Sequence, residues 1–227
     1  MTIASTKARR KIEYEVTGLA ASGDLIYRYG EAQHYEPVFR KEKNISFGAG
    51  LRFSKMITEI IDPANPDPFS HVAMLQRMAP DDVRVWDMSD EGLRRFELRD
   101  WMRETHHWGH IEIRRLLENH QVIGSNAANW LEDLRDEKDP DYDFEFEPKD
   151  GQYYCAEADN ASYTVQGIQM PDLVELTEQP GYGLTHKLIA WKGKLSTKVA
   201  LPGNENIGMR SSPLFGVVYA CAGEIVP

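Results

Sequence analysis

One cysteine, Cys155, occupies a position that constrains the fold of this chain. It follows an aromatic and acidic run at 142–147, which predicts a strand, and a turn at 148–151. A helical segment then runs from Cys155 to about Val165. The strand–turn–helix order places the thiol at a helix N-terminus, where backbone N–H groups favour a thiolate and can bind an oxyanion. We expect an α+β domain with Cys155 as nucleophile. A buried structural cysteine is the alternative reading of this residue.

A histidine precedes this cysteine in an equally defined place. His71 follows a proline-rich loop at 62–68 and begins the apolar segment Val72–Met78, which predicts a strand. The separation from Cys155 is 155 − 71 = 84 residues. An imidazole in this role takes the thiol proton and later returns a proton to the leaving group. The alternative is a histidine with an ordinary structural role at a sheet edge.

A carboxylate that orients the imidazole is expected on the next strand. The segment Val83–Met88 predicts that strand and carries Asp87. Antiparallel pairing brings Asp87 to the histidine if the register permits, and a third polar group normally holds a catalytic imidazole. A solvated carboxylate at the end of a strand is as compatible with the pattern. Asp90 and Glu91 are the other candidates for the same role.

Composition excludes several classes of protein. A chain of 227 residues with 41% hydrophobic residues can bury a core as one domain without disulfides. Its net charge of −10 argues against nucleic-acid binding, which needs a basic patch. No apolar stretch approaches the roughly 20 residues of a membrane span, so no membrane insertion is expected. The N-terminus lacks the apolar region of a secretory signal, which predicts a cytoplasmic protein or, alternatively, a virion-borne or injected one.

The remaining elements are predicted from periodicity and turn residues. The segment 1–20 is expected to be a basic arm with a short strand at Ile12–Val16. Helices are expected at 51–61, 98–105 and 116–135, and further strands at 92–98, 109–114, 187–191 and 214–221.

Three clustered histidines, His106, His107 and His110, are candidate metal ligands. His106 and His110 stand four residues apart, but Gly109 lies between them and no carboxylate completes a zinc-protease motif. The segment is more typical of a loop between a helix and a strand. We therefore expect neither a metal nor a cofactor.

Three ordered motifs resemble a known family. The run 23–28 (GDLIYR), the run 70–73 (SHVA), and the pair of runs 142–146 (YDFEF) and 154–157 (YCAE) are similar to motifs of the permuted papain-like, NlpC-related cysteine hydrolases of the YiiX/YaeF-like group. In that group the histidine precedes the cysteine because the papain fold is circularly permuted. The resemblance covers about residues 20–170. Ala156 stands where the family has serine, and Ala158 where it has a bulkier aliphatic residue.

The resemblance implies a fold and a set of roles. The fold would be a circularly permuted papain-like (NlpC-type) fold, with a small antiparallel sheet packed on the nucleophile helix. Cys155 would be the nucleophile and His71 the base, with Asp87 at the position of the family's acidic residue. The residues expected around the oxyanion and the substrate are Tyr153, Tyr154 and Asp24.

The predicted function follows from these roles. Residues 21–170 would form the catalytic domain, with 171–227 as an extension packed on or near it. The activity would be cleavage of an amide, in a peptidoglycan-type peptide or an N-acyl amine, through an acyl-enzyme. One alternative is a structural module that kept the fold without the activity, such as a virion or secretion component assembled through the arm and the extension. Another is an acyltransferase that uses the same residues.

Overall fold

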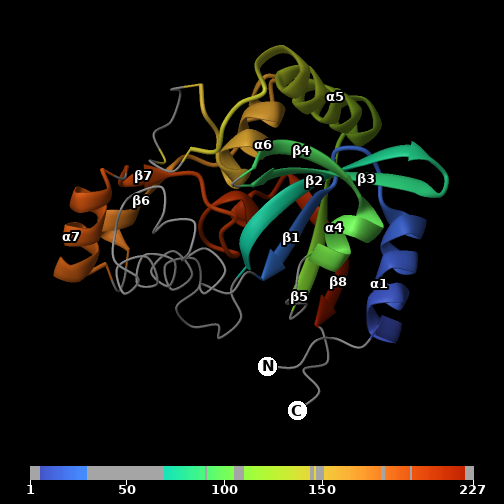
Figure 1. Ribbon diagram of the computed structural model, residues 1–227, viewed down its shortest axis with the longest axis horizontal. Helices are drawn as coiled ribbons and strands as arrows, with labels where there is room; N and C mark the ends of the chain where they lie inside the picture. Colours follow the sequence, from blue (N-terminus) through green and yellow to red (C-terminus); the bar gives the residue numbers. More distant parts are fainter. Residues whose placement is uncertain are drawn as a thin grey trace.

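A six-stranded antiparallel sheet forms the centre of the protein (Figure 1). The structure is a computed structural model that describes residues 6–29, 69–89, 91–104, 110–143, 146, 151–179, 182–194 and 196–222. The strand order is β4-β3-β2-β1-β5-β8. The strands are β1 Leu25–Tyr29, β2 Phe69–Ala79, β3 Asp82–Ser89, β4 Gly92–Glu97, β5 His110–Leu116 and β8 Phe215–Ala222.

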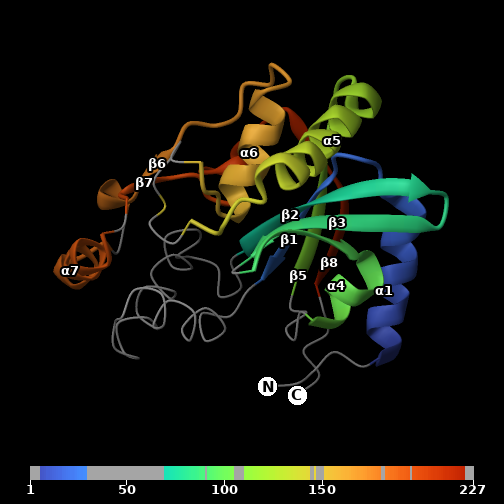
Figure 2. The same cartoon turned by 45° about the horizontal axis from the view of Figure 1, so that its top comes forward.

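Helices cover both faces of the sheet, which gives an α+β fold (Figures 1 and 2). The helices of one face are α1 Thr6–Leu19 and α4 Leu98–Glu104, and those of the other are α5 His120–Lys138 and α6 Cys155–Thr164. Side chains alternate between the faces of a strand, so each strand feeds two hydrophobic layers. The α1–α4 layer includes Ile26, Ala73, Val85 and Trp101. The α5–α6 layer includes Leu25, Val72, Trp86, Leu131 and Tyr163.

The remaining elements lie in the C-terminal third of the chain. They are β6 Val174–Glu175, the 3₁₀ helix η1 Leu176–Glu178, α7 Leu184–Gly193, β7 Lys198–Val199 and the 3₁₀ helix η2 Met209–Ser211. The short strands β6 and β7 pair with each other. The chain then returns as β8, which pairs with β5 at the edge of the central sheet. The segment that the sequence set apart as an extension therefore contributes a strand to the main sheet.

Two predicted strands are helices in the structure. Ile12–Val16 lies within α1, where Ile12 and Val16 are buried four residues apart, and the buried Ala20 directly after the helix continues this repeat. The alternation of apolar residues at 12, 14 and 16 favoured a strand, but the longer repeat decides, since a helix buries positions i, i+4 and i+8 together. The segment 187–191 lies within α7. Both strand predictions were wrong.

Other predictions match the structure more closely. The strands expected at 72–78, 83–88, 92–98, 109–114 and 214–221 correspond to β2, β3, β4, β5 and β8. The helix expected at 116–135 begins later, at His120, because Leu116 ends β5. Of the strand expected at 142–147, the described residues show only an isolated parallel bridge between Tyr142 and Tyr153. The helix expected at 51–61 lies outside the described residues.

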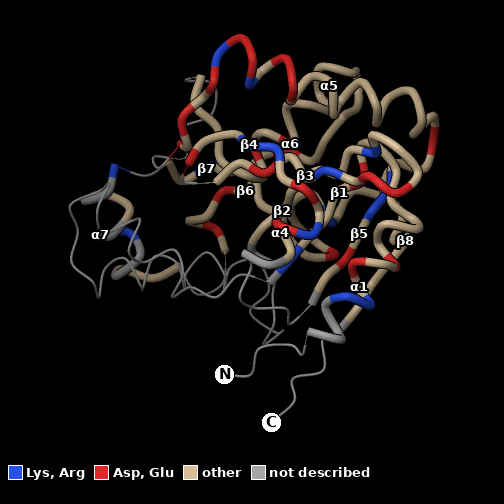
Figure 3. The backbone as a smooth tube through the Cα atoms, turned by 45° about the vertical axis from the view of Figure 1, so that its right-hand side comes forward, with Lys and Arg blue, Asp and Glu red and all other residues tan. Residues whose placement is uncertain are grey.

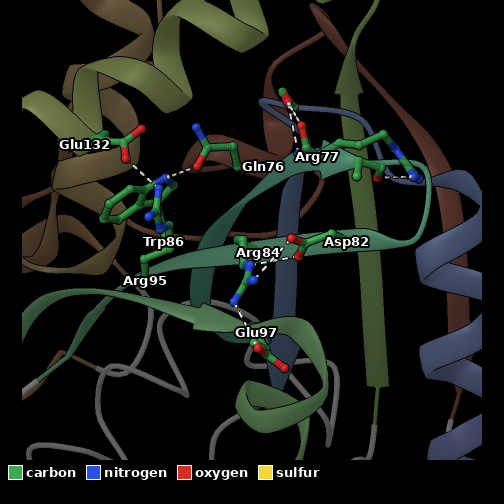
Figure 4. Close-up of polar contacts among 10 residues, drawn as sticks. Gln76, Arg77, Asp82, Arg84, Trp86, Arg95, Glu97 and Glu132 are labelled. Carbon is green, nitrogen blue, oxygen red and sulfur yellow. Dashed lines mark hydrogen bonds and ion pairs between the residues drawn. The ribbon is translucent and has the colours of Figure 1, made fainter.

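An aromatic side chain fixes α5 against the sheet (Figure 4). Trp86 of β3 donates from its indole nitrogen to Gln76 Oε1 at 2.9 Å. The guanidinium groups of Arg95 and Arg135 lie 5.2 and 5.1 Å from the centre of its ring. Arg95 also donates to Glu132 of α5 at 2.5 Å. Stacked guanidinium groups on an aromatic ring stabilise such a junction.

Two glycines allow the loop before β1 to meet α5. A Cβ built on Gly124 would lie 2.4 Å from the carbonyl oxygen of Ser22, and one on Gly23 would lie 2.2 Å from the Cα of Gly124. Gly23 also has a φ of 86°, which only glycine adopts without strain. The backbone contact therefore requires glycine on both sides.

The substitution Gly124→Ala should lower the free energy of unfolding by about 1–3 kcal/mol, since the added methyl group meets backbone atoms that cannot move aside. The matched control is Gly18→Ala in α1, where a Cβ meets nothing within 4 Å. Helix propensity alone predicts that both changes stabilise, by up to about 1 kcal/mol. Guanidinium denaturation measures both variants. A gain of stability in Gly124→Ala would contradict the contact.

Candidate active site

A buried histidine–carboxylate pair joins two adjacent strands. His71 of β2 and Asp87 of β3 approach at 2.7 Å between Nε2 and Oδ1, and both side chains are buried. The register pairs Met74 with Trp86, so Asp87 lies opposite Ala73 and on the same face as His71. The pairing that the sequence predicted for these two residues is therefore present.

The environment of Asp87 keeps its carboxyl group ionised. Burial by itself raises the pKa of Asp87, but the charge and hydrogen bond of His71 oppose it, and the net pKa is below its ordinary value. The Arg28 charge and a hydrogen bond from Trp101 act in the same direction. Trp101 donates from its indole nitrogen to Oδ2. Both oxygens thus have partners, and His71 is held through Nε2 in one ring orientation, with Nδ1 as its other ring nitrogen.

The candidate nucleophile is the first residue of α6. Cys155 is a free cysteine, 8% exposed. Tyr154 precedes it in an extended conformation and makes no side-chain cap to the helix. The first backbone N–H groups of a helix have no partner within the helix, so this end is suited to binding a negative charge. α6 packs against β2 and β3, the strands that carry His71 and Asp87.

The two halves of the candidate site, the His71–Asp87 pair and Cys155, belong to different layers of the fold. His71 and Asp87 alternate with Val72 and Trp86, so they lie on the face of the sheet that carries Trp101 of α4. Cys155 belongs to the layer on the α6 side. The charges of the two halves still act on a shared neighbour, because Cys155, Asp87 and His71 each shift the pKa of one buried carboxyl group.

That carboxyl group belongs to Asp159, which sequence reasoning missed. Asp159 is 3% exposed, and its Oδ2 has no hydrogen-bond partner among the described residues. Burial is the largest cause that raises the pKa of Asp159 well above its ordinary value, and the charges of Cys155 and Asp87 raise it further. The charge of His71 partly offsets this rise. Its position four residues after Cys155, on the same side of α6, was the available signal.

The substitution Asp159→Asn should make the protein more stable than wild type at neutral pH. The folded-state pKa of Asp159 is raised, so the folded state favours the protonated form. Below the unfolded-state pKa of about 3.9 the stability of the wild-type protein is intact, and it falls as the pH rises from there toward the folded-state pKa of Asp159. Asparagine keeps the shape and cannot ionise. The difference in unfolding free energy should therefore widen above about pH 4. Urea denaturation at several pH values measures it, and a difference independent of pH would contradict the burial of an ionisable group.

The two tyrosines beside the cysteine make structural contacts. The Tyr154 hydroxyl accepts a hydrogen bond from the Ala200 backbone N–H at 2.5 Å, and its ring packs against Phe146 at 4.9 Å between centroids. The ring of Tyr153 meets Trp130 edge-on at 6.2 Å. Tyr154 therefore ties the start of α6 to the C-terminal segment. A part in binding the oxyanion or the substrate remains a prediction for both residues.

Asp24, which was predicted beside the substrate, is held by an arginine and a backbone N–H, and its part in substrate binding remains a prediction. Arg115 donates to both of its carboxylate oxygens at 2.8 Å, and the Ala21 N–H donates to Oδ2 at 2.7 Å. The preceding residue, Gly23, accepts a hydrogen bond from Tyr163. Tyr163 lies 163 − 155 = 8 residues beyond Cys155, which corresponds to about 12 Å along a helix. Asp24 therefore fixes the loop whose Gly23 carbonyl the Tyr163 hydroxyl contacts.

The described residues contain no group of three or more His, Cys, Asp or Glu side chains placed to hold a metal ion. His106 and His107 lie outside the described part of the chain, and His110 begins β5. Within the same described part, no helix has the length and apolar character needed to cross a bilayer.

Comparisons with known proteins identify the fold. No family model and no curated protein matches the sequence. Among solved structures, the chain is similar to one described as metalloprotein yiiX from Escherichia coli O157:H7, with a TM-score of 0.62 and 17% sequence identity. The match covers 88% of this chain and 96% of that one. The chain therefore has a YiiX-like fold, and at this identity the likeness extends to the fold alone.

Proposed function

We propose that the protein is a cysteine hydrolase of the permuted papain-like (NlpC-type) class, which cleaves an amide through an acyl-enzyme on Cys155. The observation that carries the proposal is the buried His71–Asp87 pair, joined at 2.7 Å on strands that pack against α6. A free cysteine begins that helix. The YiiX-like fold supports the same assignment.

The proposed reaction has two steps. His71 Nδ1 takes the proton from Cys155 Sγ, and the thiolate attacks the carbonyl carbon. The C–N bond then breaks as the imidazolium gives its proton to the leaving amine, and a thioester remains on the cysteine. In the second step His71 deprotonates a water molecule, which attacks the thioester and releases a carboxylic acid and the free thiol. The proposal requires Sγ and Nδ1 to come within hydrogen-bond reach during this cycle.

The other groups stabilise charge in these steps. Asp87 holds the imidazole by Nε2 and stabilises the imidazolium that forms. The N–H groups at the start of α6 would bind the oxyanion of the tetrahedral intermediate. The proposed substrates are a peptidoglycan-type peptide or an N-acyl amine. The deep burial of Cys155 favours acyl transfer as a second candidate, because a thioester shielded from water can be attacked by an amine or alcohol acceptor instead.

The acyl-enzyme can be tested with an activated ester. The intact protein is mixed with p-nitrophenyl acetate, and p-nitrophenolate release is followed together with the protein mass. We expect a burst of p-nitrophenolate and one acetyl group on Cys155, located by peptide mapping. Cys221→Ala, which removes the other cysteine, should keep the burst. Acetylation spread over surface lysines, with none on Cys155, would overturn the proposal in favour of a structural module.

A further inference from the structure

The helix α7 carries an exposed apolar stripe. Leu184 is 74% exposed, Leu188 49% and Trp191 76%. Their spacing of four and then three residues places all three on one side of the helix. Ala190, on another side, is buried, as is Tyr182 just before the helix. The body of the protein therefore covers one side of α7 and leaves a second apolar side in solvent.

The position of α7 makes this stripe accessible to a large surface. Figures 1 and 2 show α7 at the end of the molecule opposite α1, beyond the short β6–β7 pair. A single exposed apolar residue needs no explanation, whereas a contiguous set on a projecting helix marks an interaction site.

The sequence of α7 and its immediate flanks is locally basic, unlike the chain as a whole. The net charge of the protein is −10, yet residues 179–204 contain four lysines and no acidic residue. Lys187 lies on α7 and Lys194 directly follows its last residue, and both are exposed. Figure 3 shows blue lysine positions on α7, whereas acidic positions cluster elsewhere. An exposed apolar stripe edged by lysines therefore projects from an acidic protein.

We propose that α7 binds the surface of an anionic lipid bilayer and lies parallel to it. Leu184, Leu188 and Trp191 would enter the boundary between head groups and acyl chains, which is the preferred location of tryptophan. Lys187 and Lys194 would meet the lipid phosphates. The acidic remainder of the protein does not prevent this contact, because repulsion is screened beyond a Debye length of about 8 Å at physiological salt.

Several observations favour a bilayer over a protein partner. The groove of a partner protein would contact a helix along one narrow face and would hold its side chains in shaped pockets. The exposed side of α7 instead combines an indole and two leucines with a lysine at its edge, which are residue types that interfacial helices use. The stripe is short, so binding should be reversible and should need both the apolar and the charged contributions. The proposal does not depend on the chemistry at Cys155.

Vesicle sedimentation with the full chain tests the proposal. Wild type should sediment with phosphatidylcholine vesicles that contain phosphatidylglycerol, and at least about tenfold less with phosphatidylcholine alone, because the lysines contribute only on an anionic surface. Trp191→Ser should weaken binding to the anionic vesicles by about tenfold or more, since it removes the largest inserted side chain. Raised salt and the double change Lys187→Gln with Lys194→Gln should also weaken it.

Matched controls separate the helix from general surface effects. Tyr14→Ser removes an aromatic residue of α1 that is 81% exposed, and it should leave binding unchanged. Circular dichroism confirms that each variant is folded. Absence of binding to anionic vesicles would overturn the proposal, as would equal loss of binding in the two variants. Self-association that depends on Trp191, without vesicle binding, would instead identify a contact between copies of the chain.

Discussion

Replacing Glu112 by alanine is expected to lower the free energy of unfolding by about 3–5 kcal/mol, because it removes a buried counter-ion that two buried cations share. Glu112 of β5 accepts from Arg114 Nε at 2.5 Å and from Arg210 Nε at 3.0 Å on Oε1. Its Oε2 accepts from Arg210 Nη2 at 3.0 Å. Arg114 further donates to the Arg210 carbonyl at 2.6 Å. All three side chains are buried.

The charge state of Glu112 supports this expectation. Burial raises its pKa, but hydrogen bonds and charges from Arg210 and Arg114 outweigh burial, so the pKa stays below the ordinary value. The matched control is Glu97→Ala, which removes an exposed partner of Arg84 at 3.2 Å and should cost less than about 1 kcal/mol. Guanidinium denaturation compares the two variants. Equal, small losses would show that the buried cluster does not hold η2 to the sheet.

The change Asp87→Asn should slow acetylation of Cys155 by p-nitrophenyl acetate by about 100-fold or more at neutral pH. The amide cannot stabilise the imidazolium, and it favours the wrong ring tautomer. Asp24→Asn is the matched control, since Asp24 is also a buried carboxylate paired with a cation, but its partner is Arg115 and not His71. Stopped-flow absorbance measures the burst for variants shown to be folded. Equal slowing in both variants would mean that general destabilisation, and not the orientation of His71, controls the thiol.

The parts of the fold that sequence predicted are those set by local patterns. Apolar segments at 72–78 and 83–88, joined by a turn at 79–82 that contains a proline, predicted β2 and β3, and hence the pairing of His71 with Asp87. The strand prediction at Ile12–Val16 failed because a short window cannot separate alternation from a four-residue repeat. The helix assignment became evident only with Ala20, beyond that window.

Other features depend on tertiary contacts that no local pattern contains. Glu112 and Arg210 are 98 residues apart and meet only because the segment that ends in η2 returns to β5. Asp24 accepts a hydrogen bond from Arg115, which is 91 residues away in the chain. The burial of Asp159 likewise follows from the packing of α6 on the sheet. In each case the surroundings of a charged residue are set by tertiary packing that the local sequence does not contain.

The central claim is that Cys155 and His71 act together, and the pH dependence of iodoacetamide labelling tests it most directly. Labelling is followed by peptide mapping in wild type and in His71→Ala, with Cys221 as the internal control. We expect Cys155 to be labelled rapidly at pH values well below the ordinary thiol pKa of about 8.5, and this reactivity to be lost in His71→Ala. Labelling of Cys155 that follows an ordinary thiol profile, or fails altogether, and that does not respond to His71 would contradict the account and leave a YiiX-like structural module.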